Sequence, residues 1–553
     1  MKKHTINKII LLFAAVFVSS CELDRFPETE FSDTDFWNSE TDLMNACNRF
    51  YQQLDGFYPL DNRADDNTNQ NPDLISNGQR QIPATSGDNW NEPYDNIFVA
   101  NNILEKGVKA QVADAVKNRY FAEARFFRAY NYFNLVKLYG GVPLLLKTLE
   151  ITSPELTMGR NSRAEVMQAI YDDLDFAAEW LPTRAALPVI QYGRVTKSAA
   201  LALKARAALY EGTRAKFHND GDWQSHLTLA VQAASAVMQQ GHVLYPSYAG
   251  QFKHESEGPS NTENIFVKIY GIDSSNPIVS HNYSRDLENG RIAPTRNLLR
   301  QYLYTDLLPA FSTTNMATPT RSTFFVPEAT EPSYNTIFEN RDPRMTMTVY
   351  LAGEQAYKGP WIPKTSLGSR TAYATKKGFN IEDWAINNSG TMDRTLIRYA
   401  EVLLIYAEAK FELNDAISDA DLDLSINKLR DRINFGHLTN TLVSDNGLNM
   451  RDEIRRERTV ELALEGFHYD DIIRWRTAEV VLPQAILGAK YTATDWVDTP
   501  PDNNTLILNE DDVLIVEAAT SRSFDPLRDY LYPIPFNEIA LSDNNVIQNP
   551  NWE

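Results

Sequence analysis

The chain has 553 residues, of which 43% are apolar, and it carries a formal net charge of −20 at pH 7. A chain of this size and composition can bury a large core, and its length alone would allow roughly three or four domains. The acidic balance excludes nucleic acid as an expected partner, because phosphate backbones require a basic protein surface.

The N-terminus has the pattern of a secretory signal peptide. Lysines within the first eight residues precede an apolar run from Ile9 to Val18, and two serines lead into Cys21. The run is too short to span a hydrocarbon core of about 30 Å. The Ser-Ser-Cys sequence resembles a lipoprotein processing site, which implies removal of residues 1–20 and acylation of Cys21. A secreted protein without a lipid anchor is the alternative.

The chain contains two cysteines, Cys21 and Cys47. Cys47 has helical spacing from Leu43 and Phe50, so it is expected to be a buried thiol rather than a nucleophile. With Cys21 modified, no disulfide can form. No His/Cys spacing is typical of a metal site, and we expect neither a metal nor a cofactor.

The first structured region is expected to begin after a tether. Residues 22–38 are polar and contain proline, and Ser39 with Asp42 has the spacing of a capping box. This predicts a helix that runs to about Asp55. Residues 61–90 are almost entirely polar and without periodicity, which indicates a long loop, and long loops in compact proteins are often functional.

Helical periodicity then occurs in two groups separated by an irregular segment. Between 241 and 393, Pro, Gly and Asn dominate, and only Asn264–Tyr270 and Met345–Leu351 are candidates for extended structure. The helices on either side form four predicted pairs: 117–139 with 163–181, 196–214 with 223–240, 394–413 with 421–434, and 450–465 with 469–480.

Helix pairs of this length, rich in Ala and Tyr, are similar to tetratricopeptide units, although the Trp and Pro markers of that repeat are missing. We therefore predict a mainly α fold. Its helix pairs, at about 112–240 and 394–480, form a right-handed superhelical wall, and residues 241–393 form a large irregular insertion on the ligand side. Both parts belong to one domain that spans residues 39–553.

The stretch from Arg451 to Arg476 carries many alternating charges on two short helices. Pairs such as Glu453 with Arg456 and Arg458 with Glu461 have ion-pairing spacing, and each would contribute only about 0.2–0.5 kcal/mol in an isolated helix. By itself the pattern is typical of a solvated, salt-bridged face.

The sequence RRERTVELALEGFHYDDIIRW in this stretch closely resembles the C-terminal motif of the SusD/RagB family. FAEARFFRAYNYFNLVKLYGGVPLL, GRVTKSAALALKARAALYEG, NRDPRM, IRYAEVLLIYAEAKFEL and YPIPFNEI resemble further family blocks in the family's order. The resemblance implies a surface lipoprotein of the outer membrane, exposed outside the cell, that captures a glycan for a SusC-like TonB-dependent transporter. It also implies that N-terminal loops and loops of the insertion build the ligand surface.

Aromatic rings stack on sugar faces, and Asp, Asn and Arg pair with sugar hydroxyls. Trp180 and Trp475 lie in helical patterns and are expected in the core, whereas Trp90, Trp361 and Trp384 lie in apparent loops. The candidate ligand-binding residues are Asp65, Asp66, Asn89, Trp90, Tyr283, Trp361 and Arg370.

Several of these candidates have structural alternatives. Trp90 also fits a packing motif before a helix, Asp65 and Asp66 also fit a solvated loop, and Arg370 could pair with a loop carboxylate.

A calcium loop is a weaker interpretation of the same stretch. Asp65, Asn67 and Asn69 have the first spacing of such a loop, but Gln70 replaces its turn glycine and Ser76 replaces its bidentate glutamate. His218–Asp222 is expected to be an ordinary turn.

We find no nucleophile, phosphate-binding or zinc-protease motif, so we expect a binding protein and not an enzyme. A binder of peptides or other non-sugar nutrients on the same scaffold, and a helical-repeat scaffold without a ligand, are the other possibilities.

Overall fold

The computed structural model describes residues 36–57, 61–271, 280–310, 320–365, 369–496 and 506–552. The predicted signal peptide at 1–20 and the lipidation site at Cys21 lie outside the described residues. Both therefore stay predictions, as does most of the tether.

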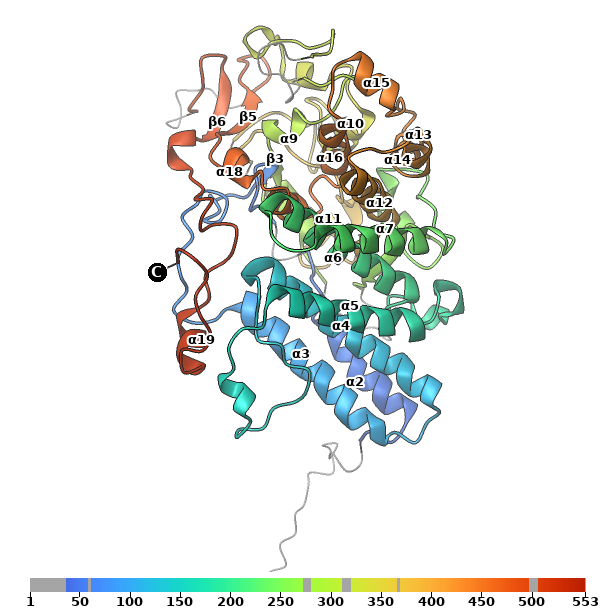
Figure 1. Cartoon of the computed structure of the whole chain (residues 1–553). Coiled ribbons are helices and arrows are strands. Elements are labelled where there is room, and N and C mark those ends of the chain that lie inside the picture. Colours follow the sequence, from blue (N-terminus) through green and yellow to red (C-terminus); the bar gives the residue numbers. More distant parts are fainter. Residues whose placement is uncertain are drawn as a thin grey trace, which may run out of the picture.

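The protein is a stack of long helices. They are α2 (Glu40–Gln52), α3 (Asp88–Lys106), α4 (Asp114–Tyr139), α5 (Arg163–Trp180), α6 (Lys197–His218), α7 (Trp223–Met238), α12 (Tyr399–Asn414) and α16 (Met450–Glu461). From α3 onward each packs on the next one named, so the helices rise through the molecule in that order (Figure 1). The predicted mainly helical, tetratricopeptide-like wall is confirmed.

Local signals in the sequence set the starts of these helices. Ser39 accepts a hydrogen bond from the backbone of Asp42, whose carboxylate accepts one from the Ser39 backbone, so the predicted capping box is present. Ser162 and Glu165 form a second box at α5, and the predicted cap Thr196 begins α6. The alanines of α6 are buried, which lets α5 and α7 approach closely.

The second group of helices differs from the prediction. Residues 394–398 form strand β4 (Arg394–Arg398) and not the start of a helix. The predicted helix 421–434 is broken into α13 (Asp419–Leu424) and α14 (Ile426–Arg432), and 469–480 into α17 (His468–Arg474) and α18 (Ala478–Val481). Helix α16 packs on α12 and α17 packs on α6, while Arg458 of α16 forms an ion pair of 2.8 Å with Asp471 of α17. The last two helices therefore touch, but each packs mainly on a different helix.

The described residues of the segment 241–393 are irregular, as predicted, and their helices and strands are short. They are β2 (Asn264–Lys268), α8 (Tyr283–Glu288), β3 (Ala293–Pro294), α9 (Arg296–Leu299), α10 (Pro343–Thr348) and α11 (Ile381–Ala385). Strand β2 confirms the predicted extended segment there, and it pairs antiparallel with β4. The second extended prediction is wrong: Met345 lies in α10, because Asp342 caps that helix and Pro343 occupies its first turn.

The remaining elements cover the ends of the stack. Strand β1 (Asn67–Thr68) pairs antiparallel with β3, and β5 (Ile486–Lys490) pairs antiparallel with β6 (Val513–Glu517). Helices α15 (Asn440–Asp445) and α19 (Phe536–Leu541) complete the fold. The C-terminal segment, red in Figure 1, runs along one side of the stack from β6 to α19.

Many charges of the Arg451–Arg476 stretch are buried, among them Glu457, Arg458 and Glu461, so a solvated face is the wrong interpretation. Glu461, which is 0% exposed, accepts hydrogen bonds from Arg344, Arg398 and Arg432 at distances of 2.5–2.9 Å. Burial alone would raise the pKa of Glu461, but the three guanidinium groups hold it well below its ordinary value. Since these arginines come from the insertion, β4 and α14, the network joins parts far apart in sequence.

Candidate ligand-binding cleft

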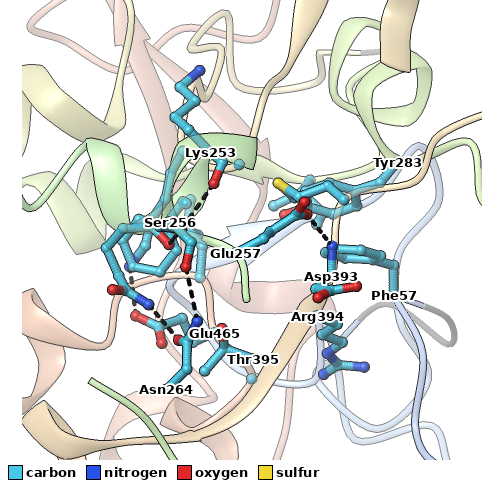
Figure 2. Close-up of a pocket in the computed structure, with 18 of the residues that line it drawn as sticks. Phe57, Lys253, Ser256, Glu257, Asn264, Tyr283, Asp393, Arg394, Thr395 and Glu465 are labelled. Atoms are coloured by element: carbon cyan, nitrogen blue, oxygen red, sulfur yellow. Dashed lines mark hydrogen bonds and ion pairs between the residues drawn. The ribbon is translucent and has the colours of Figure 1, made fainter. Parts of the chain in front are cut away.

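An inner cleft of about 100 Å³ lies between the helical wall and the insertion (Figure 2). Several stretches that are distant in sequence line it, among them Phe57 after α2, Tyr283 at the start of α8, Asp393–Thr395 around the start of β4, and Leu464–Gly466 beyond α16. The cleft is therefore bordered both by an N-terminal segment and by the insertion.

One side of the inner cleft is an aromatic pair. The rings of Phe57 and Tyr283 are stacked, with centroids 4.2 Å apart and an interplanar angle of 24°. Gly378 lies against Tyr283 with a φ of +79°, and a Cβ there would come within 2.9 Å of the tyrosine ring. Glycine thus allows the backbone to lie against the pair, and the half-buried ring of Phe57 gives the cleft an apolar side.

Carboxylates and amides lie opposite these rings. The Asp393 Oδ1 accepts a hydrogen bond of 2.9 Å from the Tyr270 backbone, and Glu257 accepts one of 2.6 Å from the Asp393 backbone. Burial raises the pKa of the Asp393 carboxyl to about 7, and the nearby negative charge of Glu257 adds to this effect. Asp393 can therefore either donate or accept a hydrogen bond near neutral pH.

Arg394 is the cation of the inner cleft that is free to meet a ligand. Its guanidinium makes no hydrogen bond or ion pair with any residue in the part of the chain that the structure describes, and Figure 2 shows it pointing away from the other labelled side chains. By contrast, Lys377 is bound at 2.6 Å to Glu465, which also pairs with Arg398 at 2.7 Å. The ion-pair network thus fixes this wall of the cleft.

A second hollow of about 130 Å³ adjoins the first and shares Arg394, Thr395, Glu465 and Gly466 with it. It lies against the inner face of α4 and α6, where Tyr130 donates a hydrogen bond to Asp55. The amide of Asn134, which also lines this hollow, makes no hydrogen bond to another described residue. Arg394 therefore stands where both hollows can be reached.

Of the predicted site residues, Tyr283 lines the inner cleft. Asp65 and Asp66 do not, and they are not a solvated loop either. Asp65 binds His468 at 2.9 Å, and Asp66 is 5% exposed and accepts a hydrogen bond of 3.1 Å from Asn67. Burial raises the pKa of Asp66 to about 6. Both residues hold the segment around β1 in place, while their neighbours Asp61 and Asn67 reach the cleft.

Asn89 and Trp90 lie in α3 and not in a loop, because the helix begins two residues earlier than Trp90. Trp90 is 4% exposed and packs on Tyr94 and Tyr139, so the packing interpretation is the one that the structure favours. Asn89 is exposed and borders a separate outer groove of about 650 Å³ beside residues 62–87.

Trp361 and Arg370 are also structural. Trp361 is 6% exposed and donates a hydrogen bond of 3.3 Å to Tyr334 inside the core of the insertion. Arg370 pairs at 3.0 Å with Glu517 of β6, which is the alternative left open for it. Trp384 is half-buried, and its indole donates to Glu288 at 2.8 Å. None of these three side chains lines the inner cleft, and ligand binding by Trp361 and Arg370 stays a prediction.

Phe57, Asp393 and Arg394 are among the cleft residues that the sequence analysis does not predict. The sequence predicts a helix that begins at Arg394, whereas the structure places Arg394 at the start of β4, which pairs with β2, and Arg394 lines the cleft. In the stretch considered for a calcium loop, the Asn67 side-chain nitrogen donates hydrogen bonds to the Asp61 carbonyl and to the Asp66 carboxylate. Among the described residues, no group of three His, Cys, Asp or Glu side chains could hold a metal ion.

Comparison with known proteins identifies the family. Residues 262–552 match a model described as the SusD family, and residues 35–209 match one described as "Starch-binding associating with outer membrane". The first match covers more than half of the chain. The chain belongs to the SusD family.

Similar SusD-family proteins cover nearly the whole chain. A SusD-like protein P38 of Formosa agariphila is 25% identical over 505 residues, which are 87% of this chain and 93% of that protein. The crystal structure of a SusD-like carbohydrate binding protein from Bacteroides fragilis is 25% identical, with a TM-score of 0.74 and coverage of 92% and 99%. A laminarin binding SusD-like protein, 19% identical, shares the fold with a TM-score of 0.59 over 93% of this chain and 100% of its own.

Proposed function

We propose that this SusD-family protein is a cell-surface lipoprotein that binds a glycan in the inner cleft and delivers it to a SusC-like TonB-dependent transporter. The observation that carries this proposal is that one cleft is lined both by the stacked rings of Phe57 and Tyr283 and by Arg394, whose guanidinium has no partner among the described residues. Sugars have apolar C–H faces and polar edges, so rings beside a free donor suit them.

The size of the inner cleft narrows the kind of ligand. Its 100 Å³ and the 130 Å³ of the adjoining hollow fall below the 300–1,000 Å³ that is common for ligand pockets. A long polysaccharide cannot enter, but a single chain end or branch can. The remainder of the ligand would then lie outside, available to the transporter.

The proposed location follows from the N-terminus and from the family. The sequence Ser19-Ser20-Cys21 supports a lipid anchor, and the description of the matching family model names association with the outer membrane. None of the described helices is long and apolar enough to cross a bilayer. An anchor at Cys21 would place the helical stack on the membrane surface without a spanning segment.

Binding without catalysis is proposed because the polar groups of the cleft are held by structural contacts. Glu257 and Asp393 are engaged by backbone amides, and Glu465 is engaged by Arg398 and Lys377. The solved structure from Bacteroides fragilis, whose sequence is 25% identical, is named as a carbohydrate binding protein, which supports the same conclusion.

The proposal is tested by calorimetry with the mature protein and a panel of starch, laminarin and other oligosaccharides together with mixed peptides. We expect binding of at least one glycan and its loss in Arg394→Ala. Binding of peptides alone would favour the non-sugar nutrient alternative. Absence of any binding would favour a scaffold that only assembles proteins.

A further inference from the structure

A third hollow, of about 230 Å³, lies where the C-terminal segment crosses the ends of α6 and α17. We call it the basic pocket, after Lys137, Arg214, His218, Arg476 and Arg528. No Asp or Glu stands among the described residues that line it. In a chain with a net charge of −20, a pocket whose charged lining residues are all basic is unexpected.

Three of these cations form ion pairs with acidic residues that do not line the basic pocket. Lys137 is 2.6 Å from Asp470, Arg214 is 2.7 Å from Asp220, and Arg528 is 2.8 Å from Asp529. None of these three carboxylates lines the basic pocket. The cations are thus held in fixed positions while their remaining N–H groups are available to the hollow.

Three donors of the basic pocket lack hydrogen-bond acceptors in the described part of the chain. Arg476 has one ion-pair contact, to Glu479 at 3.9 Å, which is too long for a hydrogen bond. Tyr210 is 5% exposed, and its hydroxyl makes no hydrogen bond. The buried Nη1 of Arg214 also has none, although Glu211 lies 3.6 Å away. Of these three, the Arg214 Nη1 is a buried donor without an acceptor, which is costly unless a ligand meets it, whereas Arg476 is exposed and can donate to a ligand or to water.

The backbone of Arg476 adds to this observation. Its φ is +56°, in the left-handed region that favours Gly or Asn at the end of a helix. An arginine there is strained by about 1 kcal/mol, so the guanidinium is kept at this position against a local preference.

The pKa of His218, the histidine of the basic pocket, is lowered by burial and in part by positive charges nearby. His218 Nε2 donates a hydrogen bond of 2.8 Å to the Ile473 carbonyl, which leaves Nδ1 without a proton in the neutral ring. Burial lowers the pKa of His218 to about 4, and the charges of Arg214, Arg476 and Arg163 act in the same direction. A bound anion would oppose both effects.

We propose that the basic pocket is an anion site, which takes a carboxylate, sulfate or phosphate group through Arg476, Arg214 and Tyr210. Lys137 and Tyr210 also line the second hollow beside the inner cleft, so the two sites adjoin. An acidic substituent of a glycan could therefore reach it. That choice of carrier rests on the proposed function, whereas the anion site itself does not.

The test uses the full mature protein in detergent, titrated with sodium sulfate, sodium phosphate and sodium glucuronate at constant ionic strength. Arg476→Gly removes the guanidinium and relieves the left-handed strain, and Tyr210→Phe removes the hydroxyl with little change in packing. Arg49→Ala, at an exposed position of α2, is the matched control. We expect each pocket variant to weaken anion binding about tenfold, and the control to leave it unchanged.

Two further readouts locate the anion. Crystals soaked in tungstate should show an anomalous peak within hydrogen-bond distance of Arg476, and histidine NMR should show a rise in the pKa of His218 with sulfate. Unchanged affinity in both pocket variants, or a tungstate peak elsewhere, would overturn the proposal. If sulfate binds but acidic oligosaccharides bind no better than neutral ones, the anion site stands and only its glycan carrier is rejected.

Discussion

Arg398 and Glu461, which are 63 positions apart, meet at 2.7 Å in the interior of the protein with exposed side-chain fractions of 2% and 0%. The same arginine binds Glu263 at 3.0 Å and Glu465 at 2.7 Å. This single guanidinium therefore connects the wall, the insertion and the border of the inner cleft. Removal of one partner would leave buried charges without compensation.

Arg398→Ala should accordingly lower the free energy of unfolding by about 3–5 kcal/mol. The reason is that Glu263, Glu461 and Glu465 would keep their buried charges and lose a shared donor. Chemical denaturation followed by circular dichroism measures this change, with Arg49→Ala as the exposed control. A loss below about 1 kcal/mol would show that the network is not essential to the fold.

Arg394→Ala should lower glycan affinity and leave stability unchanged. Because Arg394 has no partner among the described residues, its removal should leave the denaturation midpoint within experimental error. A hydrogen bond to a charged group contributes about 1.5–3 kcal/mol, so glycan affinity should fall about tenfold or more. Calorimetry and a thermal melt on the same sample separate the two effects. A stability loss without an affinity loss would remove Arg394 from the site.

Trp361→Ala should destabilise the insertion without a direct effect on binding. The Trp361 ring is 6% exposed in the core of the insertion. Truncation of a buried tryptophan lowers the free energy of unfolding by about 3–5 kcal/mol. Affinity, measured where the variant is still folded, should remain near that of the parent protein. Trp361→Phe, which keeps most of the packing, should recover much of the stability. A variant that is stable yet unable to bind would instead support a ligand contact.

His468 and Asp65 should make stability depend on pH. Burial of His468 opposes its charged form and would lower its pKa. The hydrogen bond to Asp65 and the negative charges of Asp66 and Asp65 outweigh this effect, so the pKa of His468 rises from 6.5 to about 9. When the pKa of a group is higher in the folded state than in the unfolded state, protonation of that group stabilises the fold. The stabilisation is complete at pH values below the unfolded-state pKa and is lost as the pH rises through the folded-state pKa. The contribution, on the order of 3 kcal/mol, should therefore disappear between about pH 6.5 and 9.

Denaturation midpoints across this pH window measure the effect. His468→Gln keeps a donor for Asp65 but cannot titrate, so its stability profile should be flat where that of the parent protein falls. Parallel profiles for the two proteins would show that another group is responsible for the pH dependence.

The starts of the long helices were available from the sequence because their signals act over a few residues. The Ser39–Asp42 box and the Thr196 cap each complete hydrogen bonds within one helical turn. Periodicity over α4 to α7 is likewise a local property, and it predicted the stacked wall. The family resemblance depended on the same blocks, so fold and family were predictable together.

The interior and the site were decided by tertiary structure. The charges between Arg451 and Arg476 have the local pattern of a solvated face. Arg344, which is 113 positions from Glu457, nevertheless forms a hydrogen bond of 2.7 Å with Glu457, and this face is buried in the folded protein. Arg394 became a cleft residue only when β4 paired with β2. The physical reason is that caps and periodicity are satisfied by neighbours in sequence, whereas burial of a charge depends on which distant counter-charge the completed fold brings to it.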